Sequence, residues 1–162
     1  MKYVNDKVRR QDRLLEEEKA LILLRCGEYG VLSMIDDTEN SAYGVPVNFV
    51  WDGATSIYIH CAPEGRKLRC IALNSNVSFC IVGNTNVISK KFTTEYESVV
   101  LRCTANVGLP VDERKHALEL ILKKYSLQDM SVGLKYAEKS FFRTEIIRLD
   151  IIEYSGKCKK VV

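Results

Sequence analysis

Residues 56–67 read SIYIHCAPEGRK, and this stretch joins a strand pattern to a cationic loop. Side chains alternate between the two faces of a strand, which places Ile57 and Ile59 on one face and Tyr58 and His60 on the other. The proline and glycine that follow cannot continue a strand ladder and favour a sharp turn. The stretch therefore predicts a strand, a tight loop and the start of a short helix.

The loop carries two adjacent cations, Arg66 and Lys67, to the predicted start of that helix. Arginine offers a planar fork of donors, lysine offers a mobile point charge, and the first turn of a helix has free N–H groups. This combination suits a phosphate group. Taken alone, an Arg-Lys pair on a loop is more often solvated surface charge, so both interpretations stay open.

Two further strands are predicted before this stretch, at residues 29–35 and 42–51, joined by a polar turn at 36–40. Pro46 interrupts the second strand because it has no N–H to donate to a ladder, so we expect an edge, a bulge or a ligand beside it. The dipeptide Asp-Gly at 52–53 is typical of a hairpin and leads directly into the strand at 56–61.

The rest of the chain alternates between strand and helix patterns. Residues 126–140 carry no decisive pattern and are left open. The expected helices cover residues 12–25, 64–73 and 110–125, and the expected strands cover residues 77–82, 95–107 and 142–154, with a loop at 83–91.

These elements predict a mainly β, α+β fold in which short hairpins build an antiparallel barrel or sandwich with helices outside. The chain has no βαβ rhythm and neither glycine-rich phosphate motif, GxGxxG or GxxxxGK[ST], which excludes Rossmann and P-loop folds. We expect a single domain over residues 1–162, with residues 1–11 as a polar N-terminal arm.

Composition excludes several classes of function. The chain has 162 residues and a formal charge of +3 without a long basic run, which argues against nucleic acid as the main partner. No stretch is apolar enough for a membrane span or a signal peptide, so we expect no membrane partner and a cytoplasmic location. Six cysteines without a CxxC pair and only two histidines make a metal site unexpected.

Three regions together resemble one known family. They are GVLSMID with YGVPVNFVWDG between residues 30 and 53, IYIHCAPEGRKL with NSNVSFCIVG between 57 and 83, and FTTEYESVVLRCTANVG at 92–108. Their order and spacing are similar to those of the pyridoxamine 5′-phosphate oxidase-like flavoproteins, nearest the nitroimidazole-resistance (Nim) branch. The chain lacks the C-terminal substrate-binding segment of pyridoxamine phosphate oxidase itself, so vitamin B6 oxidation is not expected.

The resemblance implies a split β-barrel of the FMN-binding type, which forms a homodimer with FMN in clefts between the protomers. It implies that Arg66 and Lys67 hold the phosphate. It assigns ten further residues to the flavin site. Seven would line the ring: Pro46, Val47, Asn48, Phe49, Ile59, His60 and Cys61. The other three, Thr94, Tyr96 and Ser98, are assigned less directly. His60 is the candidate catalytic residue, although a hydrogen-bonded structural histidine fits its position equally well.

The function expected from this resemblance is an FMN-dependent oxidoreductase, similar to Nim-type nitroreductases. It would transfer electrons or hydride to a small-molecule acceptor such as a nitroaromatic. The alternative, from a different class, is a protein that holds flavin or haem on the same fold without turnover. A dimer that has lost its cofactor is the third option.

Overall fold

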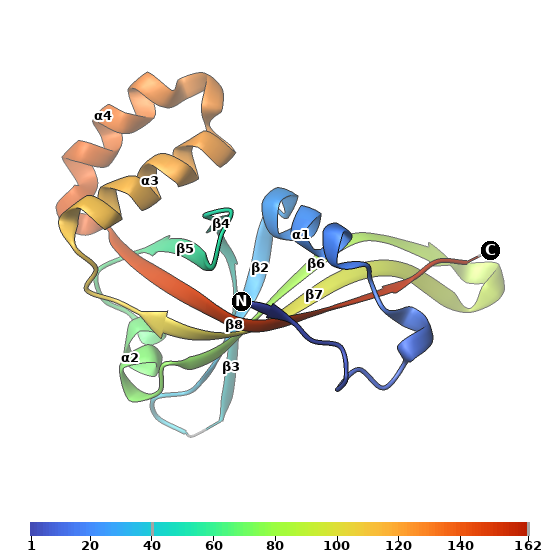
Figure 1. Ribbon diagram of the computed structural model, residues 1–162. Helices are drawn as coiled ribbons and strands as arrows, with labels where there is room; N and C mark the ends of the chain where they lie inside the picture. Colours follow the sequence, from blue (N-terminus) through green and yellow to red (C-terminus); the bar gives the residue numbers. More distant parts are fainter. Residues whose placement is uncertain (40, 162) are drawn as a thin grey trace.

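The computed structural model describes residues 1–39 and 41–161, which form one sheet with helices at its rims (Figure 1). Asn40, the last residue of the predicted turn, and Val162 lie outside the described residues. The strands are β1 (Lys2–Tyr3), β2 (Tyr29–Ile35), β3 (Ala42–Asn48), β4 (Val50–Trp51), β5 (Ser56–Cys61), β6 (Asn76–Ile88), β7 (Thr93–Asn106) and β8 (Glu145–Lys159). The helices are α1 (Glu17–Cys26), α2 (Arg66–Leu73), α3 (Val111–Tyr125) and α4 (Met130–Ser140).

The strand order is β3-β2-β6-β7-β8-β5-β4, with antiparallel neighbours throughout, and β1 pairs with β8 in parallel. The two ends of this path, β3 and β4, are consecutive in the chain and are separated only by Phe49. β3 also contacts β5, so the sheet curls on itself. The predicted antiparallel architecture with outside helices is confirmed, and Pro46 does lie in an end strand of the path.

The main core fills the inside of the curled sheet. Leu32, Phe79, Leu101 and Leu149, from four different strands, are fully buried there, and Leu24 of α1 closes one side. Alternate residues of each strand point into this core, as the period of two requires.

A second, smaller core lies between the sheet and α3. It contains Val50, Tyr58, Ala117, Ile121 and Ile146. It explains why most of β5 is buried on both faces, with Ile57 and Ile59 in the main core and Tyr58 in the second core. Tyr58 is covered by α3 and donates a hydrogen bond to Glu113 at 3.1 Å.

Several predicted boundaries are wrong, and strand pairing is the common reason. The predicted loop at 83–91 is largely strand, because β6 continues to Ile88 against β7 after a register shift between Val82 and Thr85. β8 begins at Glu145 and runs to Lys159, five residues beyond its predicted end, and its last residues, Lys157 to Lys159, pair with β7. Polar residues are held in a ladder here by their neighbours and not by their own propensity.

The first helix begins later than predicted, at Glu17 instead of residue 12. A short 3₁₀ turn covers Gln11–Arg13, and Leu14 and Leu15 then bind β8, with Leu15 N–H donating to the carbonyl of Gly156 at 3.1 Å. The open region 126–140 forms a 3₁₀ turn, Leu127–Asp129, followed by α4. α2 starts at Arg66, two residues after its predicted start.

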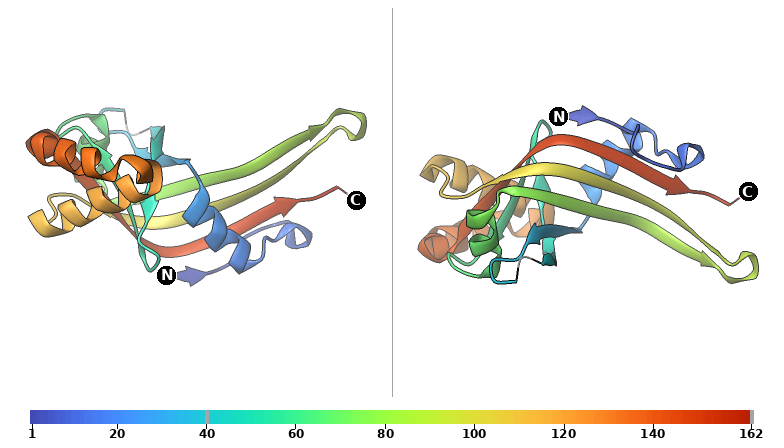
Figure 2. Two further views of the ribbon diagram at one scale, coloured as in Figure 1. Left: turned by 90° about the horizontal axis from the view of Figure 1, so that it is seen from above. Right: turned by 90° about the horizontal axis from the view of Figure 1, so that it is seen from below.

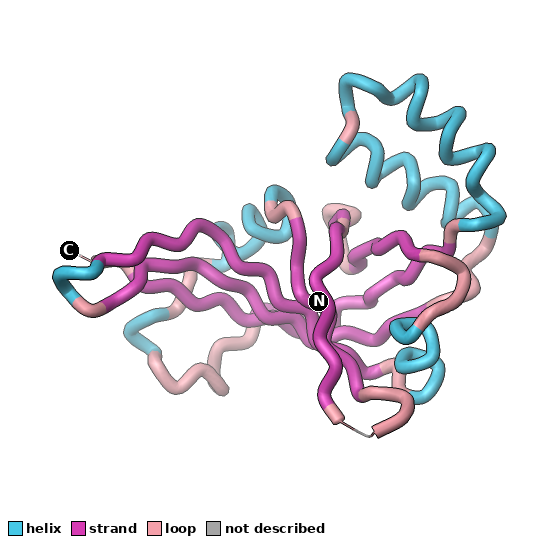
Figure 3. Tube along the Cα trace, turned by 180° about the vertical axis from the view of Figure 1, so that it is seen from behind, coloured by secondary structure: helices cyan, strands magenta, loops and turns pink. Residues whose placement is uncertain are grey.

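The outer halves of β6 and β7 and the end of β8 extend beyond the barrel as a separate projection (Figure 2). The 3₁₀ turn Ser89–Lys91 closes the β6–β7 hairpin at its tip. Seen from behind, this projection and the α3–α4 pair stand at opposite ends of the molecule (Figure 3). Among the described helices, none is both long and apolar enough to cross a bilayer.

Candidate functional site

The loop after β5 brings the two predicted phosphate ligands to the start of α2. Gly65 has a φ of 146°, a conformation that a residue with a Cβ rarely adopts, and Arg66 and Lys67 form the first turn of the helix. The glycine is therefore what allows the chain to turn from β5 into α2 at this point.

Arg66 is held by an ion pair that the sequence analysis did not predict. Its Nε donates to Asp36 Oδ2 at 2.6 Å, its Nη2 donates to the same oxygen, and its guanidinium lies 4.2 Å from the centre of the Tyr43 ring. Asp36 has 0% exposed surface and also accepts hydrogen bonds from Thr38. The bonds from Thr38, with Arg66, hold the pKa of Asp36 well below its usual range.

Sequence reasoning placed Asp36 in a polar turn and gave it no partner. A possible signal was the apolar run GVLSMI directly before it, because a carboxylate at the end of a buried strand needs a partner. Asp37 repeats the arrangement, since Arg69 Nε donates to its Oδ2 at 2.6 Å.

Lys67 makes no ion pair with the described residues, and its positive charge lies close enough to Cys61 to affect that thiol. Burial raises the pKa of Cys61, and the charge of Lys67 partly offsets the rise. Cys61 is the last residue of β5 and pairs with Glu145 in the ladder with β8.

His60 lies next to Cys61 near the end of β5 and is exposed on the side of the strand away from the main core. Partial burial of the ring among neighbouring residues lowers the pKa of His60 below its usual value. The imidazole is therefore mainly neutral near pH 7, and one nitrogen can donate while the other accepts. Ile59, the preceding residue, is fully buried in the main core.

The end strand β3 presents its predicted residues in alternation. Pro46 and Asn48 are exposed, whereas Val47 packs against the main core. Asn48 Nδ2 donates to the carbonyl of Glu28 at 2.9 Å. Phe49 has 0% exposed surface, and its ring packs edge-on against the Phe79 ring with 5.1 Å between the ring centres. This side chain therefore belongs to the core.

The break between β3 and β4 is bound by the end of α3, which sequence reasoning missed. The N–H of Phe49 donates to the Tyr125 hydroxyl at 3.0 Å, and the carbonyl of Phe49 accepts from Lys124 Nζ at 2.8 Å. Lys124 Nζ also lies 3.8 Å from the centre of the Phe49 ring. Burial lowers the pKa of Lys124 to about 8.

Thr94, Tyr96 and Ser98 do not join the other predicted residues. They lie on the projecting part of β7, where Tyr96 pairs with Thr85 and Ser98 pairs with Lys157. α2 is at the opposite end of the sheet (Figures 1 and 2). Within one chain, His60 and Cys61 precede the loop that leads to Arg66 and Lys67, Asn48 lies beside Glu28 and Lys124, and these three residues of β7 lie apart from both groups.

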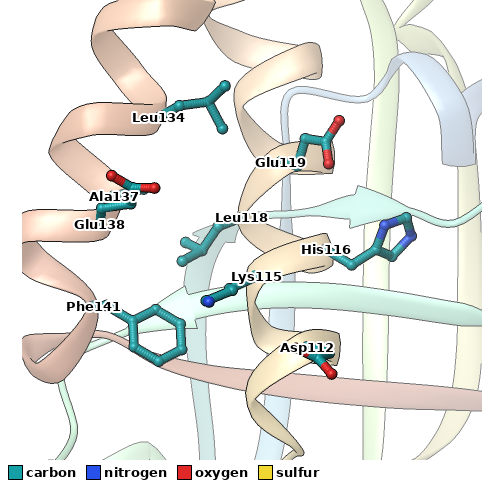
Figure 4. Close-up of a pocket in the computed structure, with 9 residues that line it drawn as sticks. All are labelled: Asp112, Lys115, His116, Leu118, Glu119, Leu134, Ala137, Glu138 and Phe141. Carbon is teal, nitrogen blue, oxygen red and sulfur yellow. The ribbon is translucent and has the colours of Figure 1, made fainter.

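Of the hollows in the described surface, one lies away from the predicted residues and another lies beside one of them. One of about 580 Å³ lies between α3 and α4, with Leu118, Leu134 and Phe141 as its apolar part (Figure 4). Another, of about 540 Å³, lies beside Asn48 and is also lined by Lys124. Neither hollow is lined by Arg66, Lys67 or His60.

One group of possible metal ligands exists among the described residues. Ligand atoms of Asp36, Asp37 and Cys70 lie within 4.8 Å of one another. Both carboxylates are already paired with Arg66 and Arg69, so we assign no metal to them.

The curled antiparallel sheet, whose path ends in the adjacent strands β3 and β4, has the form of a split β-barrel, and comparison with known proteins agrees. Residues 16–158 match the family model described as pyridoxamine 5′-phosphate oxidase, and the chain belongs to this family. No sequence among the curated proteins is similar enough to count as a match.

Solved structures share the split-barrel fold. A candidate 5-nitroimidazole antibiotic resistance protein from Bacteroides thetaiotaomicron is 21% identical, with a TM-score of 0.73 over 90% of this chain and 86% of that chain. An FAD-binding protein from Mesorhizobium loti is 19% identical, with a TM-score of 0.66 over 91% and 98%. An FAD and heme binding protein from Mycobacterium smegmatis is 18% identical, with a TM-score of 0.68 over 90% and 72%.

Proposed function

We propose that this chain is a flavin-dependent oxidoreductase that uses FMN and passes electrons or hydride to a small acceptor such as a nitroaromatic. One observation carries the proposal: in a chain of this family, a single loop joins His60, near the end of β5, to Arg66 and Lys67 at the start of α2. The FAD-binding protein from Mesorhizobium loti, which has the same fold, supports a flavin as the ligand.

The bound flavin would supply the electron or hydride transfer, and the chain would supply its position and surroundings. Arg66 and Lys67 would bind the phosphate through charge-assisted hydrogen bonds. Pro46, Asn48 and Cys61 would flank the ring at the exposed edge of β3 and the end of β5. Val47, Phe49 and Ile59 would support that edge from the core side.

His60 would form a hydrogen bond with the acceptor molecule. Because its lowered pKa leaves the ring mainly neutral near pH 7, one ring nitrogen can donate a hydrogen bond to a nitro or carbonyl oxygen of the acceptor. Replacing His60 by Gln keeps a donor of similar size, so we expect H60Q to retain more turnover than H60A at equal flavin content.

A homodimer would complete the site. Thr94, Tyr96 and Ser98 lie too far along the projection to reach the loop of their own chain, but the projection could deliver them to the flavin of a second copy. Exposed Ile22, Tyr29 and Val82 line one hollow of about 660 Å³ and offer an apolar surface for that copy. Val82→Asp should shift the dimer towards monomer in sedimentation and reduce flavin content with it.

The decisive experiment is the visible spectrum of the purified chain, followed by identification of the released chromophore. We expect FMN at about one per chain, and R66A should lose FMN under conditions in which circular dichroism shows that it is still folded. Its melting temperature should fall as well, because the buried Asp36 then lacks its cation. Arg69→Ala is the matched control, because Arg69 lies on the same helix and makes the same kind of ion pair. If R66A retains its flavin, the phosphate assignment is wrong.

A binding protein without turnover is the second candidate. The exposed imidazole of His60 is also a suitable iron ligand, and the FAD and heme binding protein from Mycobacterium smegmatis has the same fold. A Soret band in the spectrum would favour haem. A bound flavin that NADPH reduces but that no added nitroaromatic reoxidises would favour flavin storage over the nitroreductase reaction.

A further inference from the structure

Asp36 combines complete burial with an unusually full set of hydrogen bonds. Its Oδ1 accepts from the N–H and the hydroxyl of Thr38 at 2.9 and 2.7 Å and from the N–H of Glu39 at 3.3 Å. Its Oδ2 accepts both bonds from Arg66. Because the turn holds one oxygen in three directions, the carboxylate cannot rotate, and the other oxygen faces Arg66 in a fixed direction.

The guanidinium of Arg66 is correspondingly fixed on two sides. Nε and Nη2 face Asp36, and the Tyr43 ring covers one face of the plane. Nη1 makes no hydrogen bond to the described residues, and 47% of the side chain is exposed. One edge of the guanidinium therefore points to solvent with its orientation already set.

We propose that Asp36 is a positioning residue, which orients Arg66 for the cofactor phosphate without touching the cofactor itself. The proposal rests on the phosphate role proposed above for Arg66. A long side chain that is already ordered loses less conformational entropy when it binds a ligand, so pre-organisation increases affinity without a new contact. Asp36 offsets much of the positive charge of Arg66. What the ion pair contributes to phosphate binding is therefore the fixed direction of the Arg66 N–H donors. Lys67, which has no such partner among the described residues, supplies the net positive charge.

The neighbouring ion pair of Arg69 and Asp37 is a matched comparison. It joins the same helix to the same turn, but the Arg69 side chain is more exposed, at 61%, and Asp37 accepts no backbone hydrogen bond from the described residues of the turn. Replacing Asp37 therefore tests the loss of an ion pair at this place without disturbing Arg66.

The test measures the dissociation constants of FMN and riboflavin by quenching of flavin fluorescence. Riboflavin has the same ring but no phosphate, so the ratio of the two constants reports on phosphate binding alone. We expect D36N to weaken FMN at least about tenfold, the size expected when one charge-assisted hydrogen bond is lost, and to leave riboflavin unchanged. D37N should leave both constants unchanged, and D36N should have no further effect in the R66A background.

The outcomes separate this inference from the proposed function. If D36N weakens FMN and riboflavin equally, Asp36 is structural and the inference is overturned, as it also is if neither constant changes. If R66A keeps the full preference for FMN over riboflavin, the phosphate role of Arg66 fails, and the positioning role fails with it. If R66A loses the preference and D36N keeps it, only the inference fails.

D36N removes a buried charge and could prevent folding, so a milder variant makes the same test. Tyr43→Leu removes the ring that covers the guanidinium but leaves the ion pair and the apolar contact of this side chain with the core. We expect Y43L to weaken FMN several-fold relative to riboflavin, and an unchanged ratio in Y43L would contradict the proposal.

Discussion

The barrel end and the projecting strands of this protein are built from the same sheet but are stabilised in different ways. At the barrel end, β5 is covered on both sides by the two cores, and Arg66 and Arg69 tie α2 to the turn after β2. In the projection, β6 and β7 pair with each other, but most of the residues beyond Val82 on β6 are exposed, and Phe92 at the tip is 99% exposed.

This difference shows which part of the described chain is held by buried apolar contacts and which part is held mainly by strand pairing. A ribbon of two or three strands without a covered face gains little from apolar burial, whereas the barrel end buries the apolar side chains of both cores. Phe92 also has a φ of 47°, a left-handed conformation that is costly for a bulky residue. An exposed aromatic residue in a strained conformation fits a projection that packs against a second copy.

The largest effect is expected in the barrel core. Phe79→Ala removes a fully buried ring that contacts Phe49 and should lower the free energy of unfolding by about 3 to 5 kcal/mol. Chemical denaturation followed by tryptophan fluorescence would measure the change. A loss below about 1 kcal/mol would mean that the barrel core can collapse around the cavity.

A smaller effect is expected where α3 binds the break between β3 and β4. Tyr125→Phe removes the hydroxyl that accepts from the N–H of Phe49 and lies 2.7 Å from its carbonyl, so we expect a loss of about 1 to 3 kcal/mol. Denaturation of Y125F beside wild type would measure it. Tyr136→Phe, in exposed α4, is the control and should change nothing; equal losses in both variants would contradict the assigned role.

The ion pair at the barrel end should make stability depend on acid. The pKa of Asp36 is lowered in the folded state, so its stabilisation is present above its unfolded value of about 4 and is lost as pH falls through the lower folded value. The difference in unfolding free energy between wild type and D36N should therefore shrink below pH 4. Glu95→Gln, at the projecting end, is the comparison, and a difference for D36N that stays constant from pH 7 to 3 would contradict this pKa.

The smallest effect is expected at the tip of the projection. Phe92→Ala removes the same kind of side chain as Phe79→Ala. Because the Phe92 ring is almost fully exposed in the single chain, the free energy of unfolding should change by about 0.5 kcal/mol or less. Denaturation at low protein concentration measures this value. A loss that grows with protein concentration would show that Phe92 packs against a second copy.

The strand patterns predicted the sheet well where burial and alternation agree. The hairpin from β4 to β5, the strand β2 and the helix α3 lie within one or two residues of their predicted positions. The projection was missed because its residues are polar, and only pairing with β7 holds residues 84–88 in a strand. Local composition cannot report a ladder whose stabilising partner lies elsewhere in the chain.

The candidate site divides in the same way. The loop motif placed His60, Arg66 and Lys67 near one another, because residues so close in sequence stay close in space. The partners of these residues came from distant segments. Asp36 lies 30 residues before Arg66, and Tyr125 lies 76 residues after Phe49. The separation of Thr94, Tyr96 and Ser98 from the loop likewise followed from the length of β7 and could not be seen in its pattern.

By itself, the sequence determined the mainly antiparallel class of the fold, its core-facing residues and the chemistry of the cationic loop, because alternation and residue type are local properties. Tertiary structure alone decided that Arg66 is oriented by a buried carboxylate, that α3 binds the break at Phe49 and that part of the predicted site lies at the far end of the sheet. These features depend on contacts between segments far apart in the chain, 30 residues for Asp36 and Arg66 and 76 for Phe49 and Tyr125, and local sequence patterns carry no information about such contacts.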